Sequence, residues 1–310
     1  MSSFIRFQPE EWMMYHATSR CIEGKAFLKP IPKVNGLFLG ILGKTMERYK
    51  EVVCVHNVVV MSNHYHLMAS VRDGKDLADF MRMLNGEVAR ELNRVWTRKG
   101  PFWDGRYNPL LLLDDEAVVN TWKYVFANSF KERLVEHPSE WPGFHGFQFW
   151  GEGRVWEGVK YDRTEFGEKS RLKSGRDLTL DDFKTVYPIK LVRPHMWKGL
   201  SHDQFRSMMC EMMDDVLVEW GAEEEVAFLG VEMVLDQDVE ETRVPKAGRR
   251  SLCRAGCIKL VIEFKRAYKV FKAMYQEALF QWTLAVSEGR STEGIKFPPG
   301  GILPGRMVPT

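Results

Sequence analysis

The chain has 310 residues, of which 45% are hydrophobic and 28% are charged. These values are typical of a soluble globular protein, and the length suffices for one large domain or two of moderate size. The net charge of +2 neither requires nor excludes a nucleic-acid partner, so the local charge pattern has to decide that question.

The cysteine content and the hydropathy indicate in which cellular compartment the protein is expected. The five cysteines form no Cys-x-x-Cys pair, and an odd number without a signal peptide argues against a disulfide framework. Cys253 and Cys257 have no nearby histidines, which argues against a zinc site. No uncharged run approaches the length that spans a bilayer. We therefore expect a cytoplasmic protein that is neither exported nor embedded in a membrane.

The first 150 residues alternate between strand-like and helix-like segments. A strand is expected over residues 12–20, a helix over 35–49, and two consecutive strands over 51–61 and 64–71. Mixed α and β structure follows from this alternation.

Two amphipathic helices and one more strand are expected further along. The first helix starts with Asp76 as its N-cap and ends in a basic turn before Gly100. A strand over residues 105–113 follows. The second helix covers residues 114–137, with acidic residues at its start and basic residues toward its end, as the helix dipole favours.

The composition changes after residue 150. Residues 151–174 are rich in glycine and charge and are interpreted as a linker or excursion. Residues 175–310 show helical periodicity and little strand pattern, so a mostly helical C-terminal domain is expected there, with a possible accessory role in DNA binding. Residues 1–150 form the first predicted domain.

Two histidines stand on one short predicted strand. His64 and His66 in the segment MSNHYHLM are two positions apart, so on a strand they point to the same face with Cα atoms roughly 6.6 Å apart. Tyr124 and Asn128 in YVFAN are four positions apart and share one face of the last predicted helix. Each pair alone also fits an ordinary core role, but together they predict a site.

These residue types suit phosphodiester chemistry. Two neutral imidazoles and one amide oxygen form an incomplete ligand set, which leaves positions on a metal ion open for phosphate oxygen and water. A tyrosine hydroxyl is a weak nucleophile at neutral pH because its usual pKa is about 10, and a nearby divalent cation would favour the phenolate. Tyr124 would lie beside such a metal.

The sequence resembles the single-tyrosine HUH transposases, and among them the REP-associated tyrosine transposases. The segments VVVMSNHYHLM and YVFAN match the two-histidine strand and the Tyr-x-x-x-Asn helix of that family, in the same order and spacing. The resemblance covers roughly residues 10–150. Ser62 and Ser129 stand where the family often has proline, but neither position supplies a metal ligand or the nucleophile.

The resemblance implies an α+β fold, with a ferredoxin-like or RRM-like antiparallel sheet and packed helices, followed here by the mostly helical C-terminal region. It implies His64, His66 and Asn128 as ligands of Mg²⁺ or Mn²⁺, and Tyr124 as the catalytic nucleophile. The expected reaction is cleavage and strand transfer of single-stranded DNA, at hairpin or palindromic sequences, through a 5′-phosphotyrosine intermediate. A monomer or a homodimer, associated with the nucleoid through DNA, fits this reaction.

Basic and aromatic residues outside the site are candidates for DNA binding, since cations track the backbone and aromatic rings stack on bases. A solvated helix face and core aromatics would explain the same residues. The candidates are Arg82, Arg90, Arg94, Arg98, Lys99, Trp103, Arg106, Arg249 and Arg250. His16 is the one other histidine singled out, because its strand is a possible neighbour of the site.

Three other functions were compared with this one. A two-histidine phosphodiesterase needs a pair of His-x-Thr/Ser motifs, whereas the chain has a single His-x-His and no counterpart. A hydrolytic metal-dependent nuclease would use the same histidines with water as the nucleophile. A domesticated, catalytically silent DNA-binding protein would keep the fold and lose the reaction, but the intact set of His64, His66, Tyr124 and Asn128 argues against it.

Overall fold

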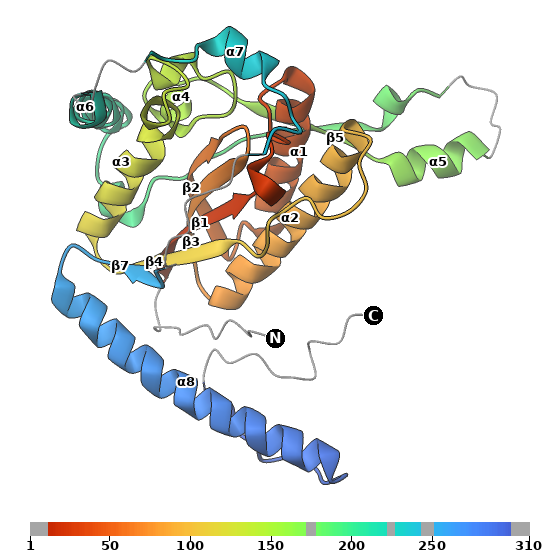
Figure 1. The fold of residues 1–310 in the computed structure, drawn as a ribbon, viewed down its shortest axis with the longest axis vertical. Helices are drawn as coiled ribbons and strands as arrows, with labels where there is room; N and C mark the ends of the chain where they lie inside the picture. Colours follow the sequence, from red (N-terminus) through yellow and green to blue (C-terminus); the bar gives the residue numbers. More distant parts are fainter. Residues whose placement is uncertain (1–11, 172–177, 222–226, 243–250, 299–310) are drawn as a thin grey trace.

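The computed structural model describes residues 12–171, 178–221, 227–242 and 251–298 (Figure 1). Its strands are β1 (Met13–Arg20), β2 (Val53–Val60), β3 (His64–Val71), β4 (Asn108–Leu112), β5 (Glu157–Tyr161), β6 (Lys184–Pro188) and β7 (Cys253–Arg254). Its α-helices are α1 (Pro32–Tyr49), α2 (Gly74–Val95), α3 (Asp115–Lys131), α4 (Gly146–Trp150), α5 (Arg163–Arg171), α6 (His202–Gly221), α7 (Val231–Asp236) and α8 (Ile258–Ser287). Short 3₁₀ helices cover Ile22–Gly24, Pro138–Glu140, Leu180–Phe183 and His195–Trp197.

The core is a five-stranded sheet in the order β2-β3-β1-β4-β7. All neighbouring pairs are antiparallel except β4 and β7, which are parallel. The first six elements, in the order β1-α1-β2-β3-α2-β4, have the ferredoxin-like arrangement. The predicted α+β fold class is confirmed, and the region after residue 175 is mostly helical as expected.

Alternation along the strands gives the sheet two different faces. Tyr65 points to the face covered by α1 and α2, where its ring lies 5.2 Å from the ring of Phe38 and its hydroxyl donates to Asn85 Oδ1 at 2.8 Å. Asn85 in turn donates to Ser19 Oγ of β1 at 2.9 Å. His64 and His66, on either side of Tyr65, therefore point to the opposite face, which α3 covers (Figure 1).

Several element boundaries differ from the predicted ones, three of them in helices. The N-cap of α2 is Asp73 rather than Asp76, because the Asp73 side chain accepts the backbone N–H of Lys75. Helix α3 ends at Lys131, short of residue 137, since Arg133 adopts a φ of 54° that no α-helix continues through. Helix α1 begins three residues early, at Pro32, a residue suited to a first helical turn.

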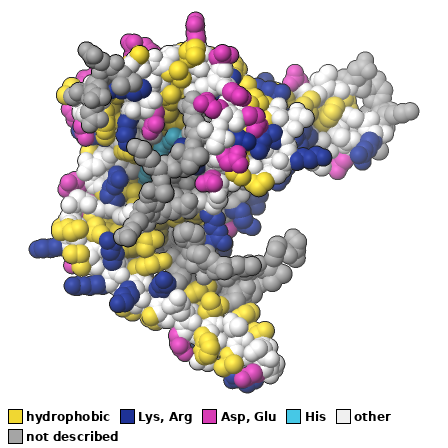
Figure 2. Space-filling view, viewed as in Figure 1, with side chains coloured by type: hydrophobic (Ala, Val, Ile, Leu, Met, Phe, Trp, Pro, Cys, Tyr) yellow, Lys and Arg dark blue, Asp and Glu magenta, His cyan; other side chains and the backbone are white. Residues whose placement is uncertain are grey.

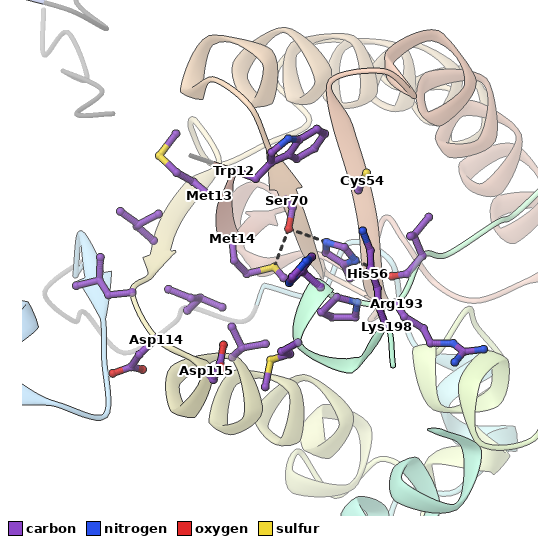
Figure 3. Close-up of a pocket in the computed structure, with 18 residues that line it drawn as sticks. Trp12, Met13, Met14, Cys54, His56, Ser70, Asp114, Asp115, Arg193 and Lys198 are labelled. Carbon is purple, nitrogen blue, oxygen red and sulfur yellow. Dashed lines mark hydrogen bonds between the residues drawn. The ribbon is translucent and has the colours of Figure 1, made fainter. Parts of the chain in front are cut away.

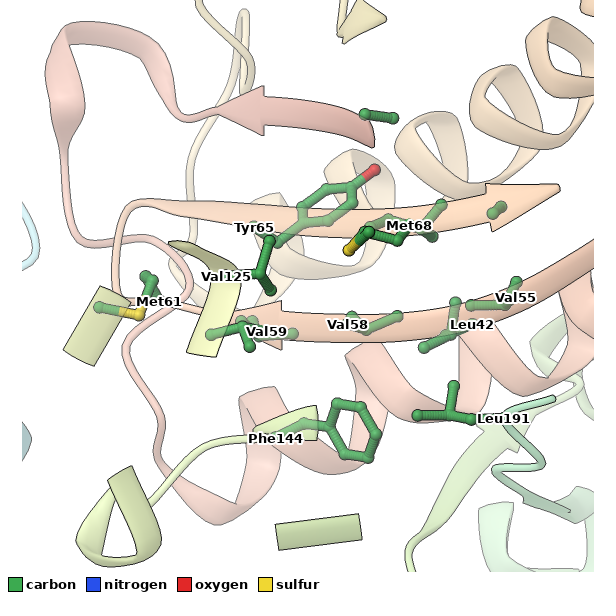
Figure 4. Packing of buried hydrophobic residues seen from close by; sticks show 14 of the residues in the cluster. Leu42, Val55, Val58, Val59, Met61, Tyr65, Met68, Val125, Phe144 and Leu191 are labelled. Carbon is green, nitrogen blue, oxygen red and sulfur yellow. The ribbon is translucent and has the colours of Figure 1, made fainter. Parts of the chain in front are cut away.

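The open edge of the sheet, strand β2, is covered by later parts of the chain. Val60 N donates to Phe144 O at 2.9 Å, and Val192 N donates to Val55 O at the same distance. Figure 4 shows Phe144 and Leu191 packed beside Val58 and the rest of this strand. Covering an edge strand in this way removes a row of unpaired backbone groups that would invite aggregation.

The segment predicted to be a linker contains β5, which pairs with β6 and packs on α1. The backbones meet directly: a Cβ built on Gly158 would lie 1.9 Å from Gly40 N, and one built on Gly40 would lie 2.1 Å from Val159 O. Only residues without a side chain allow such close approach. The proposed division near residue 175 stays a prediction, with β5 and β6 paired across it.

Two further contacts join the C-terminal region to the first 150 residues. Helix α6 packs on α3, where Lys123 Nζ lies 2.6 Å from Asp215 Oδ2. The indole ring of Trp122 on α3 also lies 5.0 Å from that of Trp197, in the 3₁₀ helix before α6. Strand β7 extends the sheet beyond β4 and leads into α8, along which Figure 2 shows Lys and Arg side chains interspersed with hydrophobic ones. Within the described residues, no helix is both long and apolar enough to cross a bilayer.

The glycine contact gives a stability prediction. Gly158→Ala should lower the free energy of unfolding by about 1–3 kcal/mol, because the added methyl group overpacks the junction of β5 and α1. Urea denaturation followed by circular dichroism measures this change. Gly167→Ala on α5 is the matched control, since its Cβ would meet nothing within 4 Å and alanine favours a helix over glycine. Equal stabilities of the two variants would contradict the packing argument.

Candidate functional site: a histidine, asparagine and tyrosine cluster

Strand β3 and helix α3 bring the four predicted residues together. The ring centroids of His64 and His66 lie 4.9 Å apart, and the ring of Tyr124 lies 5.6 Å from that of His66 at an interplanar angle of 90°. Asn128 is one turn after Tyr124 on the same helix face. The two pairs, sixty residues apart in sequence, thus form one cluster between the sheet and α3.

Asn63 fixes the tautomer of His64. The Asn63 side chain donates through Nδ2 to Gly24 O at 3.0 Å, so its Oδ1 is the atom that faces His64 Nδ1 at 2.6 Å. An amide oxygen only accepts hydrogen bonds. His64 therefore carries its proton on Nδ1, and its Nε2 keeps a free lone pair.

His66 is oriented by two residues of β1. Its Nδ1 lies 2.8 Å from His16 Nε2 and 3.2 Å from Thr18 Oγ1. Its Nε2 is buried and has no hydrogen-bond partner among the described residues. His16 Nε2 is placed to accept a proton from His66 Nδ1, and in that tautomer the Nε2 of His66 keeps its lone pair for a ligand. Outer partners of this kind commonly orient the imidazoles of metal sites.

Burial keeps all three imidazoles neutral. It lowers the pKa of His16 to about 3, with the charge of Arg254 acting in the same direction. It lowers the pKa of His64 to about 4, assisted by the charge of Arg20, and it lowers the pKa of His66 well below its usual range. Neutral imidazole is the form that binds a metal ion.

Asn128 contributes an amide oxygen to the cluster. Its Nδ2 donates to the backbone oxygen of Tyr124 at 2.9 Å, which leaves the side-chain oxygen for the imidazoles. Asn128 opposes the effect of burial on the pKa of both His64 and His66, because its oxygen would accept a proton from either ring in the charged form. The side chain of Asn128, itself 2% exposed, is thus held against both rings.

The donor set fits a divalent cation. It offers two imidazole nitrogens with free lone pairs and one amide oxygen, and the unpartnered Nε2 of His66 is a buried polar atom that a ligand would satisfy. Among the described residues, no group of three or more His, Cys, Asp or Glu side chains has a metal-binding arrangement. Asn128 would therefore be needed as the third ligand.

The groups around Tyr124 have opposing effects on the pKa of its hydroxyl. Burial raises the pKa of its hydroxyl, and the charge of Glu132 adds to this, whereas the charges of Arg254 and Arg20 lower it. Lys131 Nζ lies 4.8 Å from the centroid of the Tyr124 ring. The phenol therefore keeps its proton in the free protein, with cations at hand for a phenolate.

Comparisons with known proteins bear on the same segment. Residues 13–140 match the family model described as Transposase IS200 like. This segment of the chain is therefore similar to IS200-like transposases. The resemblance predicted from the sequence is confirmed for this part of the chain.

Two solved structures are similar to part of this chain. One is a REP-associated tyrosine transposase bound to a REP hairpin, with 16% identity over 46% of this chain and 81% of that chain, and a TM-score of 0.36. The other is a candidate transposase from Deinococcus radiodurans R1, with 17% identity over 40% of this chain and 95% of that chain, and a TM-score of 0.29. No curated protein sequence matches the chain.

The candidate DNA-binding residues on α2 lie apart from the cluster. Arg82, Arg90 and Arg94 are on α2, on the opposite face of the sheet from His66, and Arg82 and Arg94 pair with Asp79 and Glu91 at 3.1 Å. Two candidates have structural contacts: the guanidinium of Arg98 lies 3.8 Å from the ring centroid of Phe27, and Trp103 Nε1 donates to Asn85 O at 2.9 Å. Lys99 and Arg106 are exposed, and Arg249 and Arg250 lie outside the described residues. DNA binding by these residues stays a prediction.

A separate cavity of about 990 Å³ lies under the opposite ends of β1 and β3 (Figure 3). Met14, Leu112 and Val118 form part of its apolar lining, with Lys198 at its wall. His56 in this cavity is fully engaged, since its Nδ1 donates to Val192 O at 2.6 Å and its Nε2 lies 2.8 Å from Ser70 Oγ. The cavity is distinct from the cluster around Tyr124.

Sequence reasoning missed the supporting residues Asn63, Thr18, Arg20 and Arg254. His16 and Thr18 alternate on β1 as His64 and His66 do on β3, and antiparallel pairing sets Thr18 opposite His66. That shared alternation is a signal in the sequence once the two strands are known to be neighbours. Arg254 carries no such signal, because it is 130 residues from Tyr124 in the chain.

The tautomer assignment is testable by NMR of imidazoles labelled with ¹⁵N. At pH 7 His64 should be neutral with its proton on Nδ1, because its pKa is about 4 and Asn63 accepts that proton. Asn63→Ala should yield a mixture of both tautomers. Asn35→Ala, which removes an amide bound only to Pro30 O and Pro142 O, serves as control. A protonated Nε2 in the parental protein would refute the assignment.

Proposed function

We propose that the protein is an enzyme that cleaves single-stranded DNA and transfers the cut strand, with Tyr124 as nucleophile and a divalent metal ion as cofactor. The observation that carries the proposal is the position of Tyr124 within 5.6 Å of the His66 ring, next to three neutral donor groups, inside the segment that matches a transposase family. DNA transposition, or mobilisation of palindromic elements at hairpin-forming sequences, is the corresponding biological role.

His64 and His66, each through Nε2, and Asn128 through its amide oxygen would hold the metal ion. Mg²⁺ or Mn²⁺ bound there would neutralise charge on the scissile phosphate and favour attack at phosphorus. Asn63 and His16 would keep the two imidazoles in the binding tautomer throughout the reaction, since both hold an Nδ1 proton.

Tyr124 would attack the phosphorus atom through its hydroxyl oxygen. A new P–O bond forms to the phenol, the bond to the 3′ oxygen of the departing strand breaks, and the phenol proton leaves for solvent while the 3′ oxygen gains one. The products are a 5′-phosphotyrosine and a free 3′-hydroxyl. The link conserves the energy of the phosphodiester, so a second 3′-hydroxyl can reverse the step on another strand.

The remaining expectations belong to the same proposal. Single-stranded DNA with a hairpin is the proposed partner, bound by a monomer or a homodimer, with the cytoplasm as the proposed location. The nine candidate DNA-binding residues are proposed to act outside the reacting centre, because those on α2 lie on the opposite face of the sheet from His66.

Tyr124→Phe tests the nucleophile. The ring stays and one oxygen is lost, so folding and DNA binding should persist while cleavage and the covalent adduct both disappear. The assay incubates the protein with a labelled single-stranded hairpin and Mn²⁺, then looks for an adduct that survives denaturing electrophoresis. Tyr161→Phe on β5 is the matched control and should react like the parental protein. Cleavage by Tyr124→Phe at the parental rate would identify a hydrolytic nuclease instead.

His64→Ala tests the metal site. Removing one of three protein ligands should abolish measurable Mn²⁺ binding in calorimetry and lower cleavage by orders of magnitude, without rescue by added Mg²⁺ or Mn²⁺. Asn63→Ala, which leaves all ligands present, should weaken Mn²⁺ binding about 10–100-fold because only the outer partner is lost. His202→Ala at the exposed start of α6 should bind as the parental protein does. Equal Mn²⁺ affinity of all four proteins would exclude this site.

A further inference from the structure

The C-terminal region sends one arginine to the cluster. Strand β7 consists of Cys253 and Arg254 and adds to the edge of the sheet, parallel to β4 and with Arg254 opposite Leu112. Figure 1 shows β7 beside β4 and at the foot of α3, before the chain turns into α8. A residue near the end of the chain thereby comes next to the helix that carries Tyr124.

The backbone around Arg254 is firmly anchored. Leu113 N donates to Arg254 O at 2.9 Å. The carboxylate of Asp114, which caps α3 by accepting Ala117 N at 2.8 Å, also accepts Gly256 N at 3.0 Å and Cys257 N at 3.2 Å. The same carboxylate therefore fixes the start of α3 and the turn that follows Arg254.

The side chain of Arg254 reaches toward Tyr124. Its Nη1 lies 3.5 Å from the hydroxyl of Thr121, which is one helical turn before Tyr124 on α3. The guanidinium is close enough for its charge to lower the pKa of both Tyr124 and His16. Arg254 is thus next to the nucleophile on the side of the sheet where the metal ligands lie.

The charge of Arg254 is not neutralised by an acidic side chain. Over the described residues, Arg254 takes part in no ion pair, and its side chain makes the long hydrogen bond to Thr121. The cluster itself offers only neutral donors, because the imidazoles are uncharged and Asn128 is an amide. The Arg254 side chain is exposed, so its guanidinium is open to an anionic group of a ligand that binds at the cluster.

We propose that Arg254 binds the scissile phosphate of the DNA strand beside Tyr124, so that the C-terminal segment completes the reacting centre. This inference rests on the proposed function. Arginine offers two parallel N–H groups that match two phosphate oxygens. Negative charge on those oxygens grows as the phenol attacks, so Arg254 stabilises the transition state more than it stabilises bound DNA.

The first experiment separates this role from general DNA affinity. The full-length parental protein, Arg254→Gln, Arg254→Lys and the control Arg48→Gln are compared in single-turnover cleavage of a fluorescent single-stranded hairpin taken from DNA flanking the gene. Arg48 is an exposed arginine on α1, on the other face of the sheet. Arg254→Gln should cut about 100-fold more slowly at saturating protein, Arg254→Lys should recover part of the loss, and Arg48→Gln should match the parental rate.

A second experiment measures how DNA affinity depends on salt concentration, in a protein that cannot cleave the DNA. Combined with Tyr124→Phe, Arg254→Gln should reduce the slope of log affinity against log salt by about 0.7, the value for one phosphate contact on a single strand. Thermal unfolding temperatures of the variants should agree with that of the parental protein. The Arg48→Gln change in the same background should leave the slope unaltered.

The outcomes distinguish the two proposals. If Arg254→Gln cleaves at the parental rate while Tyr124→Phe forms no adduct, the arginine role is refuted and the proposed function stands. Arg254→Gln could also cut slowly while Arg254→Lys is equally slow and the salt slope equals that of the protein without the Arg254 change. In that case Arg254 contacts no phosphate, and the inference is also refuted. If the parental protein forms no adduct with any flanking hairpin, the proposed function fails and this inference fails with it.

Discussion

The alternation of side chains along strand β3 is the constraint on which the rest of the molecule depends. Tyr65 enters the core between the sheet and α1 and α2, where Asn85 and Ser19 satisfy its hydroxyl. That anchoring forces His64 and His66 onto the opposite face, toward α3. A shift of β3 by one residue would place the tyrosine on the α3 face and both imidazoles in the core. The register of the sheet therefore determines the geometry of the cluster.

Burial has two effects in this cluster. It holds the imidazoles neutral, which prepares them as ligands, and it raises the pKa of Tyr124, which holds back the nucleophile. The same low-polarity surroundings thus favour the neutral imidazoles that the proposed reaction needs and oppose the phenolate that it also needs. Cations near Tyr124, among them Arg20 and Arg254, counter the restraint. The phenol therefore stays protonated in the free protein.

The sequence predicted much of the first 150 residues, because strand alternation and helical periodicity are local signals. Such patterns predicted the strand that carries His64 and the helix that carries Tyr124, and they also predicted that the side chains of the two elements come together. The contribution of β5, β6 and β7 was not, since their positions depend on pairing between distant segments. Gly158 looks like one glycine of a polar linker until Gly40 is found against it. Asn63 and Arg254 likewise acquire meaning only through Gly24, Thr121 and the surrounding fold.

The double use of Asp114 couples two distant parts of the chain. Its carboxylate caps the N-terminus of α3 and also accepts the backbone N–H groups of Gly256 and Cys257. A chain with another C-terminal segment would keep the helix cap but lose the hydrogen bonds that hold that turn. The start of α3 and the segment after β7 therefore share one anchor, so a change at Asp114 would disturb both.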